Sequence, residues 1–453
     1  MNPLRQYLDF YDANAELIAA HSAPVLNDRR PEARAALREA TLPAKGAPGY
    51  DIQGIDTLFE PDYGINASRL SIAADTLEPF RCEVPNLSTW LGFQVNDSYI
   101  GGSMRQLPDG VMVGSLGDAA RQFPDVVARH YARIAPLDDA QVALSTLLAQ
   151  DGICIYVPRG VKLAKPVQIV NILSGNVPIM ASRRLLIVID DDAEAQLLLC
   201  DHTQSSAPAM LINEVVEVAV GARAALHIYD LEQSTPATRR VASLWARQAQ
   251  GSSLHHGTVT LTNGITRNNL HVAACGNDTE TRLLGLAIAK ERQVVDNHTT
   301  LVHQGLRGRS NQLFKYFVGD EGRGSFIGRV KVAPGAAKVE AYQSNKNIVA
   351  TATARVHSKP ELEIYCDDVK CSHGSSTGQL DADAIFYMRQ RGIPEAMARM
   401  MLVQAFLSDV TDAIDIPALA TRLRQLTEQR LGNVKVLCGD CKADCHNPIN
   451  PKQ

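Results

Sequence analysis

The chain has 453 residues, of which 45% are hydrophobic and 21% are charged, and its formal net charge is −4. These values are ordinary for a soluble globular protein with room for two or three domains. They exclude a basic footprint for nucleic acid or an anionic membrane, and no apolar run approaches the roughly 20 residues of a membrane span. The first residues show no basic segment followed by an apolar one, so we expect no signal peptide and a cytoplasmic protein.

The N-terminal part of the chain is predicted to begin with helices. Leu4, Leu8 and Tyr11 repeat at helical spacing. Pro31 suits the first position of a second helix, which is expected to end near residue 40. Residues 43–66 are rich in Gly, Pro and Asp and predict irregular connecting chain.

The middle of the chain is predicted to be almost entirely β-structure. Its segments are short, apolar and β-branched, and Gly, Asn and Asp separate them. Residues 187–197, 216–226 and 330–340 each repeat a strand, a Gly- or Asp-containing corner with Ala, and a second strand. Repeated corners favour a solenoid, in which stacked coils bury one another's apolar faces. A β-sandwich is the alternative, although Asn-Gly hairpin turns are scarce.

Helices are predicted again after the β region. Their expected starting residues are Asp381, Pro394 and Pro417. In the first helix we expect Ile385 and Phe386 to face inward. The second carries Met397, Met400 and Met401 on a broad apolar face, which either forms core or docks a partner. The predicted parts are residues 1–149, a helical and mixed region; 150–378, the β core; 379–437, a C-terminal helical domain; and 438–453, a cysteine-rich tail.

Two side chains with metal-binding chemistry, a cysteine and a histidine, come at the end of the β region. If the strand after residue 361 stays extended, Cys371 and His373 share one face, whereas Cys366 and Asp368 share the other. A thiolate and an imidazole are ligands for iron or zinc, but two ligands do not close a site. The alternative is that Cys371 is a small buried side chain and that His373 caps the following turn.

The tail holds a denser set of thiols. Cys438, Cys441, Cys445 and His446 have the spacing Cys-x2-Cys-x3-Cys-His. Three thiolates and an imidazole suffice for a tetrahedral zinc ion or a labile iron–sulfur cluster. The alternative is a mobile chain end without a fixed ligand. The chain has nine cysteines, an odd number without regular spacing, so we expect free thiols or metal ligands rather than disulfides.

Other candidates in the β region have plainer interpretations. They are Asp296 with His298 and His303; the pair His255 and His256; the carboxylates Asp190, Asp191 and Asp192; and the glycine-rich residues 319–328. The histidines suit hydrogen bonding on a β surface, and the carboxylates suit a solvated turn. The glycine-rich segment lacks the Gly-Lys-Ser/Thr of a phosphate loop, so we expect no bound nucleotide. No motif argues for catalysis by this chain.

Several longer motifs resemble one known family. They are residues 156–161, 296–298, 328–335, 342–345, 360–374, 378–381 and 386–394. In their order, between about residues 150 and 410, they resemble the SufB/SufD family of iron–sulfur cluster assembly proteins. The segment 367–374 is similar to the SufD branch rather than the SufB branch.

The resemblance implies a right-handed parallel β-helix flanked by N-terminal and C-terminal helical regions. It also implies a heterodimer with SufB, and C-terminal helices that dock SufC, the ATPase that supplies ATP hydrolysis. The sequence leaves open whether the isolated chain forms a homodimer. His373, with Cys371 as a second group, would help to hold a transient iron–sulfur cluster together with side chains of SufB. The family usually has a small residue at position 366 and lacks this form of tail, so the resemblance assigns no role to either.

The expected function is therefore a non-catalytic scaffold for cluster assembly. One competing hypothesis is a carbohydrate-active β-helix enzyme, with acid–base pairs drawn from Asp190 to Asp192 or from Asp367 and Asp368. Aromatic residues, which would supply sugar-binding platforms, make up only 5% of the chain. The other is a stand-alone metal or cluster carrier that uses the tail.

Overall fold

The computed structural model describes residues 2–69, 89–101, 105–204 and 207–432. Its described residues belong to two compact units, the first ending at residue 379 and the second starting at residue 380. The first unit has the helices α1 (Leu4–Ala20), α2 (Pro24–Asn27), α3 (Arg30–Glu39), η1 (Asp56–Leu58), η3 (Pro108–Gly110), α5 (Leu116–Gln122), α6 (Pro124–His130) and α7 (Ala140–Leu148). The second has α8 (Ala382–Gln390), α9 (Glu395–Thr411) and α10 (Pro417–Gly432).

All described strands belong to the first unit. They are β1 (Trp90–Val95), β2 (Ser98–Ile100), β3 (Arg105–Gln106), β4 (Met112–Ser115), β5 (Ile153–Val157), β6 (Val167–Leu173), β7 (Met180–Ile189), β8 (Glu194–Thr203), β9 (Met210–Val220), β10 (Ala225–Gln233), β11 (Thr238–Gln248), β12 (Ser253–Thr262), β13 (Ile265–Ala274), β14 (Glu280–Ala289), β15 (Val294–His303), β16 (Arg309–Val318), β17 (Arg323–Val332), β18 (Val339–Val349), β19 (Arg355–Ile364) and β20 (Val369–Gly378).

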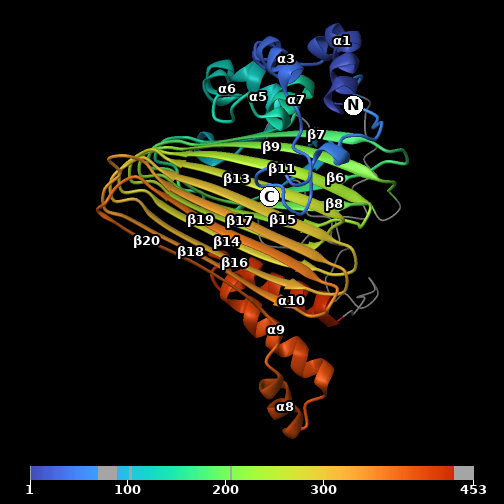
Figure 1. Ribbon diagram of the computed structural model, residues 1–453. Coiled ribbons are helices and arrows are strands. Elements are labelled where there is room, and N and C mark those ends of the chain that lie inside the picture. The colour runs from blue at the N-terminus through green and yellow to red at the C-terminus, as the bar shows by residue number, and fades with distance from the viewer. Residues whose placement is uncertain (1, 70–88, 102–104, 205–206, 433–453) are drawn as a thin grey trace. The chain divides into compact units, whose positions relative to one another are not determined.

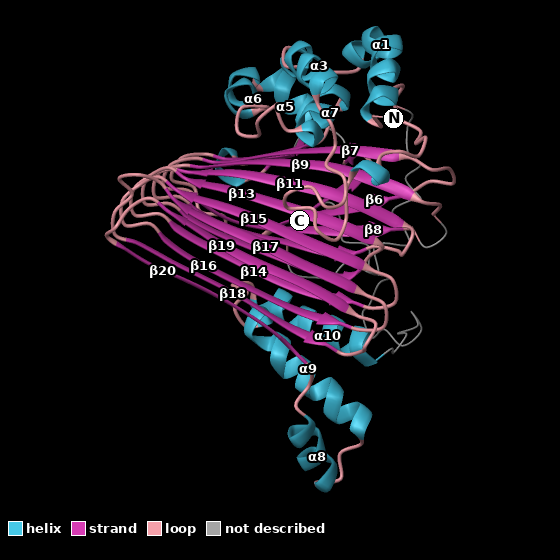
Figure 2. Ribbon diagram, in the orientation of Figure 1, coloured by secondary structure: helices cyan, strands magenta, loops and turns pink. Residues whose placement is uncertain are grey.

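These strands form a parallel β-solenoid made of two long sheets. The first sheet has the order β2-β1-β6-β8-β10-β12-β14-β16-β18-β20, and the second has the order β19-β17-β15-β13-β11-β9-β7-β5-β4-β3. Successive strands from β5 onward alternate between the sheets, and each pairs in parallel with the next strand of its own sheet (Figure 1; Figure 2). The solenoid is therefore confirmed over the sandwich, whose strands would pair in antiparallel hairpins.

One corner of the solenoid repeats the same backbone device on coil after coil. A residue with positive φ donates its backbone N–H to a carbonyl group of the next coil. These residues are Gly160, Asp192, Arg223, Gly251, Asp278, Arg307 and Lys338. Asp192, Arg223 and Lys338 belong to the three segments whose repetition predicted the solenoid, so those segments are equivalent corners of different coils. The hydrogen bonds satisfy backbone groups that a sharp turn would otherwise leave without partners.

Apolar side chains from both sheets fill much of the interior. Ile155 and Ile187 of the second sheet and Leu197 and Ile228 of the first are completely buried in one hydrophobic cluster. Burial of each such side chain contributes about 1.5–3 kcal/mol. These contacts join coils that are distant in sequence, as expected for stacked repeats.

A buried carboxylate fixes the N-terminal helices to the solenoid. The consecutive N–H groups of residues 132–135, just after α6, donate to the carboxylate of Glu217 on β9 at 2.7–3.1 Å. The left-handed φ of Ala132, +50°, turns the backbone so that these donors converge. Arg184 of β7 completes the arrangement with an ion pair of 2.6 Å to the same carboxylate.

The predicted helices at both ends of the chain are confirmed, with one correction. Helix α1 covers the periodic residues near the N-terminus, and the side chain of Asp381 caps α8 by accepting two backbone N–H groups. Ile385 is buried as expected, but the inward position predicted for Phe386 is wrong, because its side chain is 60% exposed. No described helix combines the length and apolar character that would let it cross a membrane.

Candidate functional site

The solenoid ends in two unpaired strand edges within the described chain. β20 is the last strand of the first sheet and pairs with β18, and β19 is the last strand of the second sheet and pairs with β17. Each terminal strand is ten residues long. The outer N–H and C=O groups of both strands are therefore available to another chain.

Cys371 and His373 lie on the same face of β20, as strand alternation predicted. In the register with β18, Cys371 pairs with Ala341 and His373 pairs with Gln343. Ala341 and Gln343 are buried residues of the solenoid interior, so Cys371 and His373 continue the lumen-facing rows to the open end. Burial raises the pKa of the Cys371 thiol, and a hydrogen bond with the backbone of Ala341 partly offsets this effect. The role of both residues as metal ligands stays a prediction.

Cys366 does not lie opposite Cys371, contrary to the expectation for a straight extended segment. It precedes β20 at a corner of the last coil, where Lys338 donates its N–H to the carbonyl oxygen of Asp368 at 2.6 Å. Cys366 and Cys371 are both half-buried and pack against the same apolar cluster, which includes Val339. Two thiols therefore border the interior near the open end.

The interior becomes polar toward that end. Gln343 donates to Gln312 at 3.3 Å, and His373 is the next residue of this lumen-facing row. In another row, Asn347 donates to Thr377 of β20 at 3.2 Å. The last coil thus offers two thiols, an imidazole and hydrogen-bonding groups near one opening, which is a partial ligand set for a metal.

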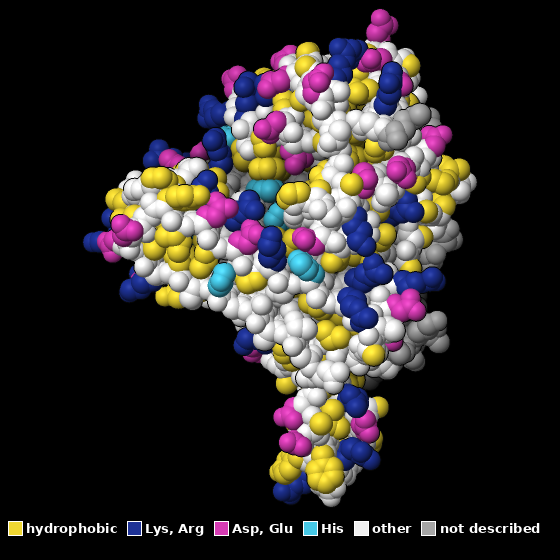
Figure 3. Space-filling view, in the orientation of Figure 1, with side chains coloured by type: hydrophobic (Ala, Val, Ile, Leu, Met, Phe, Trp, Pro, Cys, Tyr) yellow, Lys and Arg dark blue, Asp and Glu magenta, His cyan; other side chains and the backbone are white. Residues whose placement is uncertain are grey.

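The structure gives Asp296 and His298 a role in holding the N-terminal chain. Arg267 forms an ion pair of 2.5 Å with Asp296 and donates to Nδ1 of His298 at 2.8 Å. It also donates to the carbonyl oxygen of Gly49 at 2.7 Å and lies over the ring of Tyr50. Burial, with the adjacent arginine, lowers the pKa of His298 to about 3, so this imidazole is neutral. Figure 3 shows histidine side chains in a hollow of this face, beside basic and acidic groups.

The remaining histidine candidates also have structural surroundings. His303 forms a hydrogen bond with the hydroxyl of Ser310 at 2.9 Å, and burial lowers its pKa to about 4. His256 is buried inside the solenoid, where desolvation lowers its pKa to about 3. His255 lies on the neighbouring position of β12 and stacks on His227 with ring centroids 4.4 Å apart.

The acidic candidates lie at a corner, and the glycine-rich segment begins at a corner and continues into β17. Asp192 forms a two-bond ion pair with Arg223 at 2.6 and 2.7 Å, and Asp191 accepts the backbone N–H of Ala222 at 2.8 Å. In the segment 319–328, a Cβ atom on Gly322 would come within 2.5 Å of the carbonyl oxygen of Ala289. The contacts of Asp191, Asp192 and Gly322 show that the turns of the coils require these residues, so no acid–base or nucleotide-binding role is needed to account for them.

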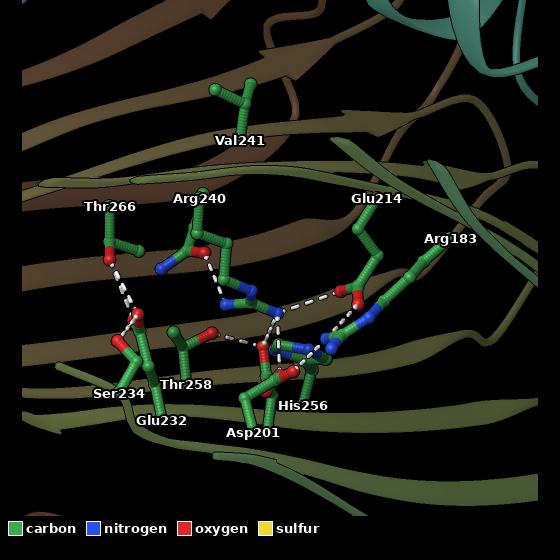
Figure 4. Close-up of polar contacts among 12 residues, drawn as sticks. Arg183, Asp201, Glu214, Glu232, Ser234, Arg240, Val241, His256, Thr258 and Thr266 are labelled. Carbon is green, nitrogen blue, oxygen red and sulfur yellow. Dashed lines mark hydrogen bonds and ion pairs between the residues drawn. The ribbon is translucent and has the colours of Figure 1, made fainter. Parts of the chain in front are cut away.

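A group of charged side chains lies inside the solenoid, where the sequence pattern did not predict it (Figure 4). Nη2 of Arg240 lies 2.8 Å from Glu214, 2.7 Å from Asp230 and 3.4 Å from Asp201. The three carboxylates are close enough together to bind one metal ion, but the guanidinium of Arg240 already supplies the positive charge among them. The signal in the sequence was a set of charged residues at alternate positions of apolar strands, such as Asp230 with Glu232 on β10.

The comparisons with known proteins all point to one protein family. The model for the SufBD core domain of the SUF system of iron–sulfur cluster assembly matches residues 172–406, and the model for the SufBD N-terminal region matches residues 1–169. The chain is 29% identical to a SufBD family iron–sulfur cluster assembly protein of Synechocystis sp., over 72% of this chain and 73% of the relative. It is 31% identical to the iron–sulfur cluster assembly protein SufD of Escherichia coli, over 70% and 73% respectively. A chloroplast protein of Arabidopsis thaliana, ABCI7, is 29% identical over 68% and 66%.

Proposed function

The chain belongs to the SufBD family of iron–sulfur cluster assembly proteins, and from that premise we propose that it is a SufD-type, non-catalytic scaffold subunit. In this proposal it pairs with SufB through the open end of the solenoid and docks the ATPase SufC through its C-terminal helices. A transient iron–sulfur cluster is held where the two solenoids meet. The cluster is the product in assembly rather than a resident cofactor of this chain, and the complex works in the cytoplasm.

The observation that carries the proposal is the pair of long open edges formed by β19 and β20. Long unpaired edges recruit other strands, and proteins usually keep them short or cover them. Exposed apolar side chains border this end: Tyr342 is 44% exposed, Ile364 is 44% exposed and Tyr365 is 57% exposed. A second solenoid that added its own terminal strands would cover them and satisfy the backbone groups.

Such pairing would bring His373 close to the partner. β20 runs from Val369 to Gly378, so His373 lies at the middle of the strand. When two strands of equal length pair in antiparallel fashion, their middle residues lie opposite each other. Cys371 is two residues away on the same lumen-facing side. The incomplete ligand set of this chain is then completed by side chains of SufB.

The second unit provides the surface proposed for SufC. Phe386, Tyr387, Met397 and Met401 are large apolar side chains of α8 and α9 that are between 42% and 60% exposed. A cavity of about 490 Å³ lies between α9 and α10, and Met401 and Leu407 are among its lining residues. Exposed aromatic and methionine side chains, of which Met401 lines the cavity, suit an apolar protein partner. In this assembly SufC hydrolyses the ATP, and this chain binds no nucleotide.

Co-expression under anaerobic conditions tests the proposal. The chain is produced with SufB and SufC, and the purified complex is analysed for iron, acid-labile sulfide and visible absorbance. We expect a ternary complex whose iron and sulfide fall at least about tenfold in His373→Ala, because a ligand at the shared site is lost. Cys371→Ala is expected to cause a smaller loss, whereas Ser372→Ala, on the outward face of the same strand, serves as the matched control.

The outcomes separate the parts of the proposal. Failure of the chain to co-purify with SufB and SufC would contradict the scaffold function. Unchanged iron and sulfide in His373→Ala, with the complex intact, would contradict the ligand assignment alone. Cys438, Cys441, Cys445 and His446 lie outside the described residues, and they stay proposed as a second ligand set. A chain that ends before Cys438 is expected to form the complex, and loss of the cluster in that complex would move the site to the tail.

A further inference from the structure

A second constellation of titratable groups lies inside the solenoid between β7 and β12. Its carboxyl groups belong to Asp201, Glu214, Asp230 and Glu232, and its guanidinium groups belong to Arg183 and Arg240. All six side chains are buried, and the least buried residue, Asp230, is 8% exposed. Burial of unpaired charge in such surroundings is strongly unfavourable, so the charge balance of the group decides its protonation.

The charge balance requires protons. Four carboxyl groups face two guanidinium groups, and the other titratable neighbours, His202 and His256, have pKa values lowered by desolvation, so both imidazoles are neutral. If all four carboxyl groups were ionised, two negative charges would have no counter-charge in the interior. Neutrality is reached when two of the four carboxyl groups are protonated.

Glu232 is the first proton carrier. Among the described residues it has no guanidinium partner, and its carboxyl oxygens instead lie 2.8–2.9 Å from the hydroxyls of Ser234 and Thr266 (Figure 4). Hydroxyl groups either donate or accept hydrogen bonds, so they accommodate a protonated carboxyl as readily as an ionised one. Burial raises the pKa of Glu232 to about 7.

The second proton belongs to the carboxyl groups that compete for Arg240. Asp230 and Glu214 lie 2.7 and 2.8 Å from the same nitrogen, Nη2, and Asp201 lies farther from it, at 3.4 Å. Asp201 is instead paired closely with Arg183, from which Glu214 is 3.9 Å away. A cavity of about 20 Å³ beside these groups is lined by Glu214 and Asp230, and it has the volume of a single water molecule. Burial raises the pKa of Asp230 to about 7, and it raises the pKa of Glu214 as well.

We propose that the solenoid interior is a proton-binding site, which holds one proton on Glu232 and one shared by Asp230 and Glu214, and that β8 to β12 open locally when these protons leave. The facing groups come from every neighbouring strand: Arg183 from β7, Asp201 from β8, Glu214 from β9, Arg240 from β11 and His256 from β12. His202 is adjacent to Asp201 on β8 and points to the opposite face of the strand. The carboxyl groups with raised pKa values in this group are Glu214, Asp230 and Glu232. Their ionisation leaves negative charge without a partner in the interior and favours opening.

Infrared spectroscopy of the full chain in D2O tests the proposal, because a protonated carboxyl has a C=O stretching band distinct from that of a carboxylate. We expect the wild-type protein to keep such a band until about pH 7, above the ordinary range for Asp and Glu. Glu232→Gln and Asp230→Asn should each remove part of it while preserving hydrogen-bonding shape. Asp192→Asn is the control, since Asp192 is an exposed aspartate of the corner that pairs with Arg223.

Hydrogen exchange measured on the same samples tests the coupling to opening. After correction for intrinsic rates, we expect exchange in β8 to β12 to rise at least about tenfold between pH 6 and pH 8 in the wild type. The rise should be smaller in Glu232→Gln. The proposal would be overturned if the band is already lost by about pH 5 as the pH is raised, or if hydrogen exchange in these strands does not change with pH. These wild-type titrations give a decision even if a variant fails to fold.

Discussion

At the scale of single residues, the carboxylate of Glu217 connects two parts of the first unit that are far apart in sequence. It accepts hydrogen bonds from the backbone N–H groups of residues 132–135 and pairs with Arg184. Both Glu217 and Arg184 are completely buried. The N-terminal helices therefore depend on one side chain of β9 for their attachment at this point.

We predict that Glu217→Gln lowers the free energy of unfolding by about 2–3 kcal/mol, because charge-assisted hydrogen bonds are replaced and Arg184 loses its counter-charge. Urea unfolding followed by circular dichroism measures the change. Glu194→Gln is the matched control, since Glu194 pairs with Lys162 at the exposed surface and should change stability by less than about 1 kcal/mol. Equal effects of the two substitutions would contradict the role assigned to Glu217.

The lumen residues show what strand alternation does not reveal. The pattern placed Cys371 and His373 on one face, and the register of β20 confirms this. It did not reveal that Asp230 and Glu232 point into the solenoid, because both faces of many strands are buried and a charged residue suggests a solvent-exposed position. Identifying the inward face requires the partner strands, which are about one coil away in the sequence.

At the scale of elements, the corners were the most predictable part of the fold. Asp192 and Arg223 belong to segments that repeat in sequence because each corner needs a left-handed residue near a small one. The described chain between residues 89 and 150 was less predictable, since its short strands and helices lack such a repeat. The chain turns a corner between Ile364 and Val369, so Cys366 does not follow the alternation of an extended strand. The face predicted for its side chain was therefore wrong.

The hydrogen-bond pattern of β18 shows which backbone N–H groups of β20 point to the open edge. Glu340, at the start of β18, donates its N–H to Gly308 on the preceding coil, and Lys370 occupies the equivalent position on β20. Alternate residues of a parallel strand direct their N–H groups to opposite neighbours. The N–H of Ser375, five residues after Lys370, therefore points to the open edge.

We predict that Ser375→Pro weakens binding to SufB by at least about tenfold, because proline removes a hydrogen-bond donor from the edge that pairs. The folded chain should keep its circular dichroism spectrum, since the lost N–H has no partner within the solenoid. Binding is measured by co-purification and by titration of the isolated proteins. Ser375→Ala is the control, and equal binding by the alanine and proline variants would show that this edge is not the interface.

At the scale of the whole molecule, buried titratable groups set the pH dependence of stability. Four histidines have pKa values lowered to about 3 or 4, chiefly by burial, whereas unfolded histidine has a pKa near 6.5. They are His256, His271, His298 and His303. Below about pH 6.5 the unfolded chain binds more protons at these positions than the folded chain, so acid favours unfolding.

The buried carboxyl groups act in the opposite direction. The pKa values of Asp230 and Glu232 are raised to about 7, so between about pH 4 and pH 7 the folded chain binds more protons there, and stability falls as pH rises. Among these large pKa shifts, the four histidines change stability more than the two carboxyl groups below about pH 6.5, so stability rises there as the pH rises. We predict a maximum of stability near pH 6.5, measured by urea unfolding across the pH range. Stability that keeps rising to about pH 8 would contradict this balance.

The two ends of the solenoid differ in a way that limits assembly. At the N-terminal end the sheets stop at β2 and β3, which have three and two residues, whereas at the other end they stop at two ten-residue edges. Short edges offer few hydrogen bonds to another chain. The described part of the chain thus has one long open end, and in the proposed assembly pairing through that end yields a two-chain particle that cannot grow into a fibre. In that proposed assembly a second copy of the chain would compete with SufB for the same end, so the relative abundance of the two chains would decide which particle forms.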